Sequence, residues 1–136
     1  MPLPLSRVLL VDDDATTNYL NKLLLTRMGV AEQIVTAENG EQALRLLSPP
    51  AGDQPAPAGF QLVLLDMNMP VLNGLAFLEA YAQLPVARQS HIIVVMLTTS
   101  LNPVDRRRAE QLPIAGFLNK PLTREKVNAL LEEHFG

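Results

Sequence analysis

Acidic residues follow two separate apolar runs of this chain, at the point where each run ends. Asp12 and Asp13 follow residues 8–11, and Asp66 follows residues 62–65. A buried strand that ends on a carboxylate presents that acid to a loop, although a lone Asp is also an ordinary polar residue at a strand end. Carboxylates brought close together repel one another, and a hard divalent cation with oxygen ligands relieves that repulsion.

Two more apolar runs end on side chains that suit phosphate chemistry. Residues 92–97 are followed by Thr98, and residues 116–119 are followed by Lys120. The Thr98 hydroxyl can donate to a phosphoryl oxygen, and Lys120 adds a positive point charge. Such a set stabilises phosphoryl transfer by position and electrostatics. Asp66 would be the nucleophile and would form an acyl phosphate.

The expected cofactor is Mg²⁺ or Mn²⁺. Mg²⁺ keeps several waters, so two carboxylates and one backbone carbonyl are enough protein ligands. We expect Asp13 and Asp66 to bind the metal directly, Asp12 to act through water, and the backbone carbonyl of Asn68 to complete the set.

The elements that would position these residues alternate between strand and helix. We expect strands at 7–11, 33–37, 60–66, 91–97 and 116–119, and helices at 16–28, 40–47, 75–82, 102–112 and from Thr123 onward. The first helix is predicted from Leu20, Leu23, Leu24 and Met28, which recur at helical spacing before Gly29 ends it. This alternation predicts an α/β domain with a doubly wound parallel sheet and helices on both faces. Sites of such sheets lie at the carboxyl ends of the strands, so the polar residues above should meet at one rim.

Composition indicates one domain, 1–136, with an aliphatic core. Apolar residues make up 48 % of the chain, with four Phe, two Tyr and no Trp. Residues 48–59 hold four Pro and two Gly, and we interpret them as an exposed insertion between the second helix and the third strand. The net charge of −3 and the lack of a broad basic stripe argue against a nucleic-acid partner. With no Cys, no signal peptide and no membrane span, we expect a cytoplasmic protein.

Taken together and in order, the motifs resemble the receiver domain of two-component response regulators. The residues that carry the resemblance are 11–13, 64–70 with Asn73-Gly74, 97–98 and 117–121. The resemblance implies a flavodoxin-like sheet of five parallel strands in the order 2-1-3-4-5, with five helices on its two faces. The segment 97–103 is similar to that of small stand-alone regulators of the chemotaxis type.

The resemblance also implies a function. A histidine kinase or histidine phosphotransfer protein would donate a phosphoryl group to Asp66, and Thr98 and Phe117 match the family's switch pair. Phosphorylation would then change how the face formed by the fourth helix, the fifth strand and the last helix binds an unidentified downstream protein. The protein would be a signalling switch that catalyses only its own phosphorylation and dephosphorylation, either a monomer or a phosphorylation-dependent dimer. The Lys120–Pro121 bond resembles the family's cis peptide.

Two other functions stay open. One is a Mg²⁺-dependent phosphatase or phosphotransferase that uses Asp66 on a small substrate; it would want a second acid near the nucleophile, where Met67 and Asn68 stand. The other is a scaffold of similar fold, which would have lost one of the site residues. Nucleotide binding is disfavoured because acids replace a glycine-rich loop after the first strand.

Two neighbouring residues are ambiguous in the sequence. Asp14 is either a further ligand or an acid at a helix start, and we favour the helix start. Asn18 lies one turn into the first helix and faces either the site or solvent.

Overall fold

The structure is a computed structural model that describes residues 5–47, 60–66, 74–83, 92–98, 107, 110–111, 114–120 and 122–135. The strands are β1 (Leu5–Val11), β2 (Ala31–Ala37), β3 (Gln61–Asp66), β4 (Ile92–Thr98) and β5 (Gly116–Asn119). The helices are α1 (Ala15–Met28), α2 (Gly40–Leu47), α3 (Gly74–Tyr81) and α6 (Arg124–Phe135). The predicted strands all form, with ends that differ from the expected ones by at most two residues.

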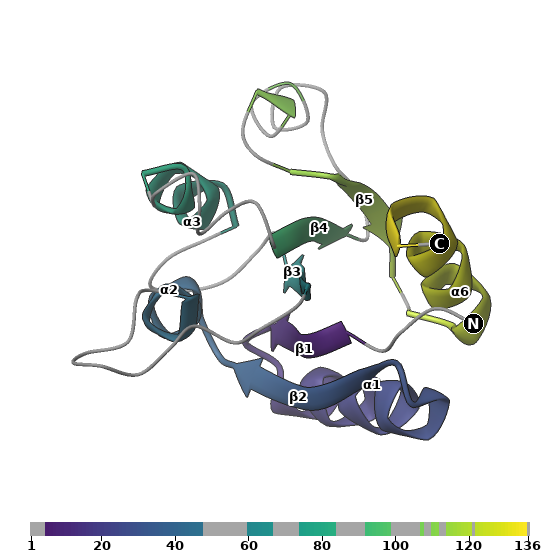
Figure 1. Cartoon of the computed structure of the whole chain (residues 1–136). Helices are drawn as coiled ribbons and strands as arrows, with labels where there is room; N and C mark the ends of the chain where they lie inside the picture. The colour runs from purple at the N-terminus through teal and green to yellow at the C-terminus, as the bar shows by residue number, and fades with distance from the viewer. Residues whose placement is uncertain are drawn as a thin grey trace.

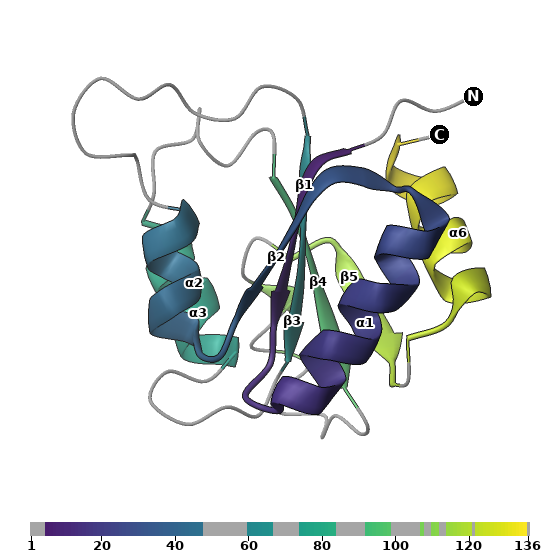
Figure 2. The same ribbon diagram turned by 90° about the horizontal axis from the view of Figure 1, so that it is seen from below.

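The five strands form one parallel sheet in the order β2-β1-β3-β4-β5. The α2 and α3 helices cover one face, and α1 and α6 cover the other (Figures 1 and 2). The predicted three-layer α/β architecture and the predicted strand order are therefore confirmed. The predicted helix at 102–112 and the insertion at 48–59 lie almost entirely outside the described residues.

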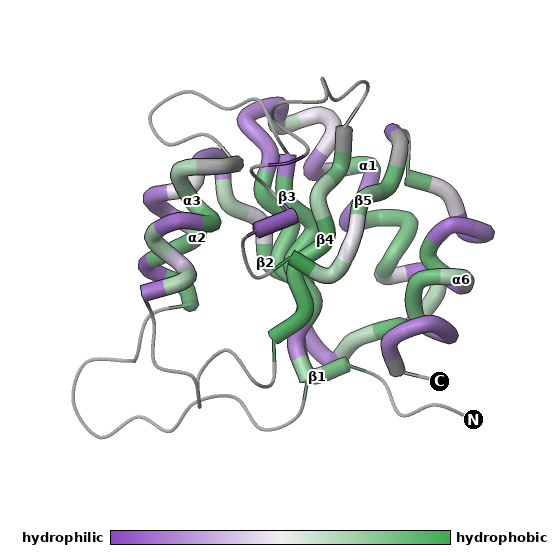
Figure 3. The backbone as a smooth tube through the Cα atoms, turned by 90° about the horizontal axis from the view of Figure 1, so that it is seen from above, coloured by the Kyte–Doolittle hydropathy of each residue, from purple (hydrophilic) through white to green (hydrophobic). Residues whose placement is uncertain are grey.

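Each face of the sheet has its own aliphatic core, because side chains of a strand alternate between the two faces. Leu9, Val11, Val63 and Leu65 pack with α2 and α3, whereas Val8, Leu10, Leu62 and Leu64 pack with α1 and α6. Every residue of β3 is buried, as expected for a central parallel strand. Figure 3 shows the hydrophobic strands at the centre and polar residues along the outer sides of the helices.

The leucine spacing of α1 predicts its buried face only in part, because Leu24 and Met28 pack against the core as predicted but Leu20 does not. Leu25 is the fully buried leucine of this helix, whereas Leu20 is 55 % exposed. The buried positions of α1 are Asn18 and Leu25, seven residues apart and therefore on one face. The helix ends as predicted at Gly29, whose φ of 65° is left-handed and whose amide donates to the carbonyls of Leu25 and Thr26.

The last helix begins as the sequence predicts. The Thr123 hydroxyl accepts a hydrogen bond from the Lys126 amide at 3.2 Å, so Thr123 is the N-cap of α6. In the part of the chain that the structure describes, no helix is both long enough and apolar enough to cross a bilayer.

Candidate functional site

The register of the sheet brings the acidic strand ends together. Val11 is paired with Leu65 in the β1–β3 ladder. Asp12 directly follows Val11, and Asp66 directly follows Leu65, so the two acids stand at neighbouring strand ends. In the next ladders Asp66 lies beside Leu97, and Thr98 lies beside Asn119, the residue before Lys120. The four strand ends therefore form one rim, as expected for a parallel sheet.

Asp12, Asp13 and Asp66 form a compact acidic cluster at this rim. One carboxylate oxygen from each of them lies within 4.8 Å of the others. Asp12 and Asp66 are only 5 % and 6 % exposed, whereas Asp13 is exposed. Three carboxylates that converge in this way offer the hard oxygen ligands that Mg²⁺ and Mn²⁺ prefer, and the exposed Asp13 leaves one side of the cluster open to water ligands. The cluster can therefore hold a divalent metal ion.

Lys120 joins the two buried acids. Its Nζ donates to Asp66 Oδ1 at 3.1 Å and to Asp12 Oδ2 at 3.2 Å. Burial by itself would lower the pKa of Lys120, but the hydrogen bond and charge of Asp66, together with those of Asp12, outweigh it, so the pKa of Lys120 is raised. Lys120 is therefore a fixed positive charge between Asp12 and Asp66.

The loop after β1 is held by short local hydrogen bonds. The Asp14 amide donates to Asp12 Oδ1 at 2.9 Å, so it holds the carboxylate oxygen that Lys120 does not contact. Asp14 itself caps α1: its carboxylate accepts from the Thr17 hydroxyl and the Thr16 amide, and these bonds lower the pKa of Asp14. The interpretation of Asp14 as a helix-start acid is confirmed.

Asn18 is neither at the surface nor directed at the acidic cluster. It is 5 % exposed, and its Nδ2 donates to the backbone carbonyls of Asp12 and Ala37 at 2.9 and 3.2 Å. Neither sequence alternative for Asn18 described this arrangement. A polar residue at a core position of α1 was the available signal, but the leucine spacing indicated a partly different buried face.

Several predicted residues cannot be placed in the site. Asn68 and Pro121 lie outside the described residues, as does the side chain of Thr98, so the metal-binding carbonyl, the cis peptide and half of the switch pair remain predictions. Phe117 is half-buried in β5 and packs against the core cluster on the α2–α3 face of the sheet.

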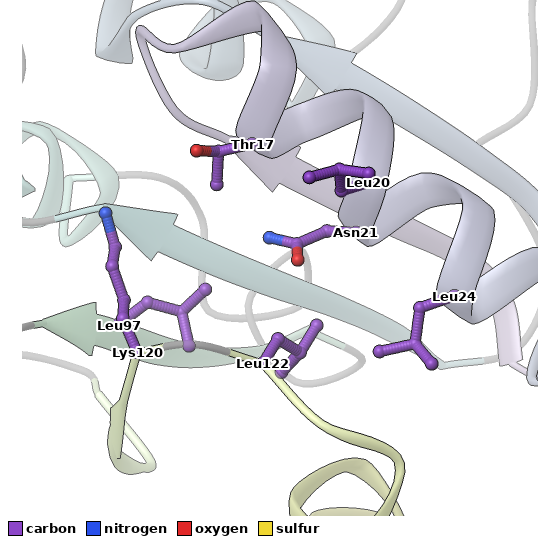
Figure 4. Close-up of a pocket in the computed structure, with 7 residues that line it drawn as sticks. All are labelled: Thr17, Leu20, Asn21, Leu24, Leu97, Lys120 and Leu122. Atoms are coloured by element: carbon purple, nitrogen blue, oxygen red, sulfur yellow. The ribbon is translucent and has the colours of Figure 1, made fainter.

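A cavity of about 590 Å³ lies next to the acidic cluster and was not predicted from the sequence. Figure 4 shows α1 on one side of it, and β4 and the segment after β5 on the other. Its wall is mostly leucine, with Lys120 at the end nearest the acids; the lining residues are Thr17, Leu20, Asn21, Leu24, Leu97, Lys120 and Leu122. The site thus adjoins a concave apolar surface.

Comparison with known proteins identifies this arrangement. Residues 8–132 match the family model described as the response regulator receiver domain. A probable chemotaxis protein CheY from Rhizobium etli is 35 % identical over 130 residues, which cover 96 % of this chain and 92 % of that protein.

Solved structures agree with the sequence match. A two-component response regulator from Cytophaga hutchinsonii is 28 % identical with a TM-score of 0.80, covering 96 % of this chain and 97 % of that one. The receiver domain of the sensor histidine kinase PA1611 from Pseudomonas aeruginosa, solved with magnesium in its active-site cleft, has the same fold at 22 % identity, a TM-score of 0.73, and coverage of 95 % and 96 %. With a family match over almost its whole length and the matching fold, this chain belongs to the receiver domains of two-component response regulators.

Proposed function

We propose that this chain is a phosphorylation-activated signalling switch that accepts a phosphoryl group on Asp66. The observation that carries the proposal is the convergence of three carboxylates and one ammonium at a single rim of the sheet. Asp66 is the acid that the central strand β3 delivers to the middle of this rim, next to both Asp12 and Lys120.

In the proposed reaction, a carboxylate oxygen of Asp66 attacks the phosphorus of a phosphohistidine on a histidine kinase or phosphotransfer protein. The new oxygen–phosphorus bond forms as the phosphorus–nitrogen bond breaks, and the bonding pair stays on the imidazole nitrogen. A Mg²⁺ or Mn²⁺ ion held by Asp13 and Asp66, with Asp12 and the Asn68 carbonyl assisting, would supply positive charge for the phosphoryl oxygens.

Lys120 contributes a charge that is already in position. Its ammonium is held between Asp12 and Asp66, so it needs little movement to contact a phosphoryl oxygen bonded to Asp66. We propose that the Thr98 hydroxyl donates to another phosphoryl oxygen, since Thr98 ends the strand next to β3.

The output of the switch is proposed to pass through Phe117. Movement of Thr98 toward the phosphoryl group would free space that the half-buried Phe117 ring, one ladder away on β5, can enter. This would alter the face predicted to include the fourth helix, together with β5 and α6, and with it the affinity for a downstream protein.

The test is intact-mass spectrometry after incubation with acetyl phosphate and Mg²⁺. The wild type should gain one phosphoryl group, while Asp66→Asn and wild type with a chelator should gain none. Asp14→Asn is the matched control: Asp14 lies in the same loop but caps α1, and Asn caps a helix as well as Asp does. A wild type that stays unmodified and binds no Mg²⁺ would instead favour the scaffold function.

A further inference from the structure

Asn18 ties together two strand ends behind the acidic cluster. Its Nδ2 donates to the Asp12 carbonyl at 2.9 Å and to the Ala37 carbonyl at 3.2 Å. The Ala37 carbonyl also accepts from the Asp12 amide at 3.1 Å. One carboxamide on α1 therefore links the end of β1 to the end of β2, at the point where β1 passes into the loop that carries Asp13.

The bond to the Asp12 carbonyl also bears on Asp13. The peptide group is planar, so fixing the oxygen of residue 12 fixes the plane that joins it to the nitrogen of residue 13. The Asp12 side chain is held separately, by the Asp14 amide and by Lys120. Asp13 is exposed and has no comparable burial to orient it. The direction of its carboxylate toward Asp66 therefore depends on the peptide plane that Asn18 holds.

In the carboxamide of Asn18, the Nδ2 group makes hydrogen bonds and the Oδ1 atom does not. Among the described residues, Asn18 Oδ1 is the buried side-chain polar atom without a hydrogen-bond partner. A buried acceptor without a donor is unfavourable, and a leucine of similar size would avoid it. An asparagine at this position is thus poorly explained by packing alone, but it is explained by the two carbonyls that its amide nitrogen contacts.

We propose that Asn18 is a positioning residue that pre-orients Asp13 for the divalent metal ion. This inference rests on the proposed function, since it assumes that the acidic cluster binds the metal. It goes further in assigning part of the metal affinity to a residue that contacts neither the metal nor the phosphoryl group. Groups that orient metal ligands in this way typically account for about 10- to 100-fold in affinity.

The test measures Mn²⁺ binding by the loss of the free-ion EPR signal, on wild type, Asn18→Leu and Asn18→Ala. We expect the dissociation constant to rise about 10- to 100-fold in both variants. The matched control is Asn21→Leu, the same substitution one turn along α1 on a side chain that lines the neighbouring cavity. It should bind Mn²⁺ within about twofold of wild type, because Asn21 lines the cavity and is not proposed to orient a metal ligand.

Thermal unfolding of the metal-free proteins separates positioning from stability. Asn18→Leu removes the unpartnered Oδ1 but also the donor to the Asp12 carbonyl, so it should unfold somewhat below the wild-type temperature and still be fully folded at the temperature of the binding assay. Its metal affinity should nevertheless fall. At saturating Mn²⁺ its rate of modification by acetyl phosphate should return toward that of the wild type, because the reacting groups are unchanged.

The outcomes distinguish this inference from the proposed function. If the wild type binds Mn²⁺ and both folded Asn18 variants bind it equally well, Asn18 does not position the ligands and the inference is wrong. If the wild type itself binds no metal, the proposed function fails instead. If neither variant folds, hydrogen exchange of the wild type decides: the Asn18 carboxamide protons should exchange far more slowly than those of Asn21, and equal rates would overturn the proposal.

Discussion

The Lys120 ammonium lies 3.1 Å from Asp66 Oδ1 and 3.2 Å from Asp12 Oδ2, so a single cation bridges two buried carboxylates. The side chain of Lys120 is 24 % exposed, whereas those of its two partners are 6 % and 8 % exposed. In the metal-free protein this bridge neutralises part of the charge that β1 and β3 deliver to the rim. A divalent ion bound at the same acids would share them with Lys120.

Replacing Lys120 should therefore lower the stability of the metal-free protein and at the same time raise its affinity for the metal ion. Lys120→Met leaves Asp12 and Asp66 without their cation, and we expect the metal-free protein to lose about 2 kcal/mol of unfolding free energy. Metal affinity should rise about tenfold or more, because a like charge next to the ion is removed. Phosphorylation by acetyl phosphate should nevertheless become slower. Urea unfolding with and without Mg²⁺, and the rate of mass gain, provide these measurements.

The control for Lys120 is Lys22→Met, which removes an exposed lysine from α1. It should change the unfolding free energy by no more than about 0.5 kcal/mol and leave the metal affinity unaltered. A Lys120→Met protein that binds Mg²⁺ more weakly than wild type would show that the ammonium supports the metal site rather than competing with it.

Asp13 should contribute to metal binding but little to the fold. Because Asp13 is exposed and lies in a cluster of like charges, Asp13→Asn should alter the unfolding free energy by about 0.5 kcal/mol or less. Its Mg²⁺ dissociation constant should rise at least about tenfold, since a direct oxygen ligand is weakened. Isothermal titration calorimetry checks this against Asp14→Asn, which keeps the helix cap. Equal affinities of these two variants would remove Asp13 from the ligand set.

The sequence was sufficient to predict which residues share one rim of the sheet, because the strand ends determine this. Buried runs that stop at Asp12, Asp66 and Lys120 place these residues at one rim in any parallel sheet of this topology. The sheet order came from the family resemblance, since alternation of strands and helices does not fix which strands are neighbours.

The surroundings of the site could not be predicted in the same way. The rotation of α1 about its axis depends on how Leu25 packs into the core, and the leucine spacing of the helix allowed a different buried face. That rotation leaves Leu20 exposed, buries Asn18 and forms the cavity beside Lys120. Such features depend on three-dimensional packing between α1 and the sheet.

Gly29 should be required at the end of α1 for its backbone conformation. Its φ of 65° is left-handed, and no atom outside its neighbours lies within 4 Å of an added Cβ, so any cost of Gly29→Ala comes from the backbone alone. We expect a loss of about 1–2 kcal/mol in unfolding free energy, measured by urea titration. Gly116→Ala is the control: an added Cβ there also meets nothing within 4 Å, but Gly116 lies in a strand without a left-handed φ. Equal losses at both positions would contradict this explanation.

Tyr81 should make the protein sensitive to alkaline pH. Its ring is buried at the end of α3 and stacks on Phe77 with centroids 6.1 Å apart. Burial raises the pKa of Tyr81 from 10.0 to about 12, because the phenolate is poorly solvated in the folded state. Because the pKa of Tyr81 is higher in the folded state, its neutral phenol contributes to the unfolding free energy. This contribution is complete below pH 10 and is lost as the pH rises from 10 through about 12.

Tyr81→Phe should remove this part of the pH dependence. The raised pKa of Lys120 also makes stability fall in alkali, so wild type and variant should both lose stability above pH 10.5, but the wild type should lose it more steeply. Urea midpoints from about pH 9 to about pH 12 give the two slopes, since the titration of Tyr81 runs from 10.0 to about 12. Tyr19→Phe is the matched control: it removes the same hydroxyl from a ring that is 65 % exposed, and it should keep the wild-type slope. Parallel curves for wild type and Tyr81→Phe would mean that the buried phenol does not ionise with unfolding in this range.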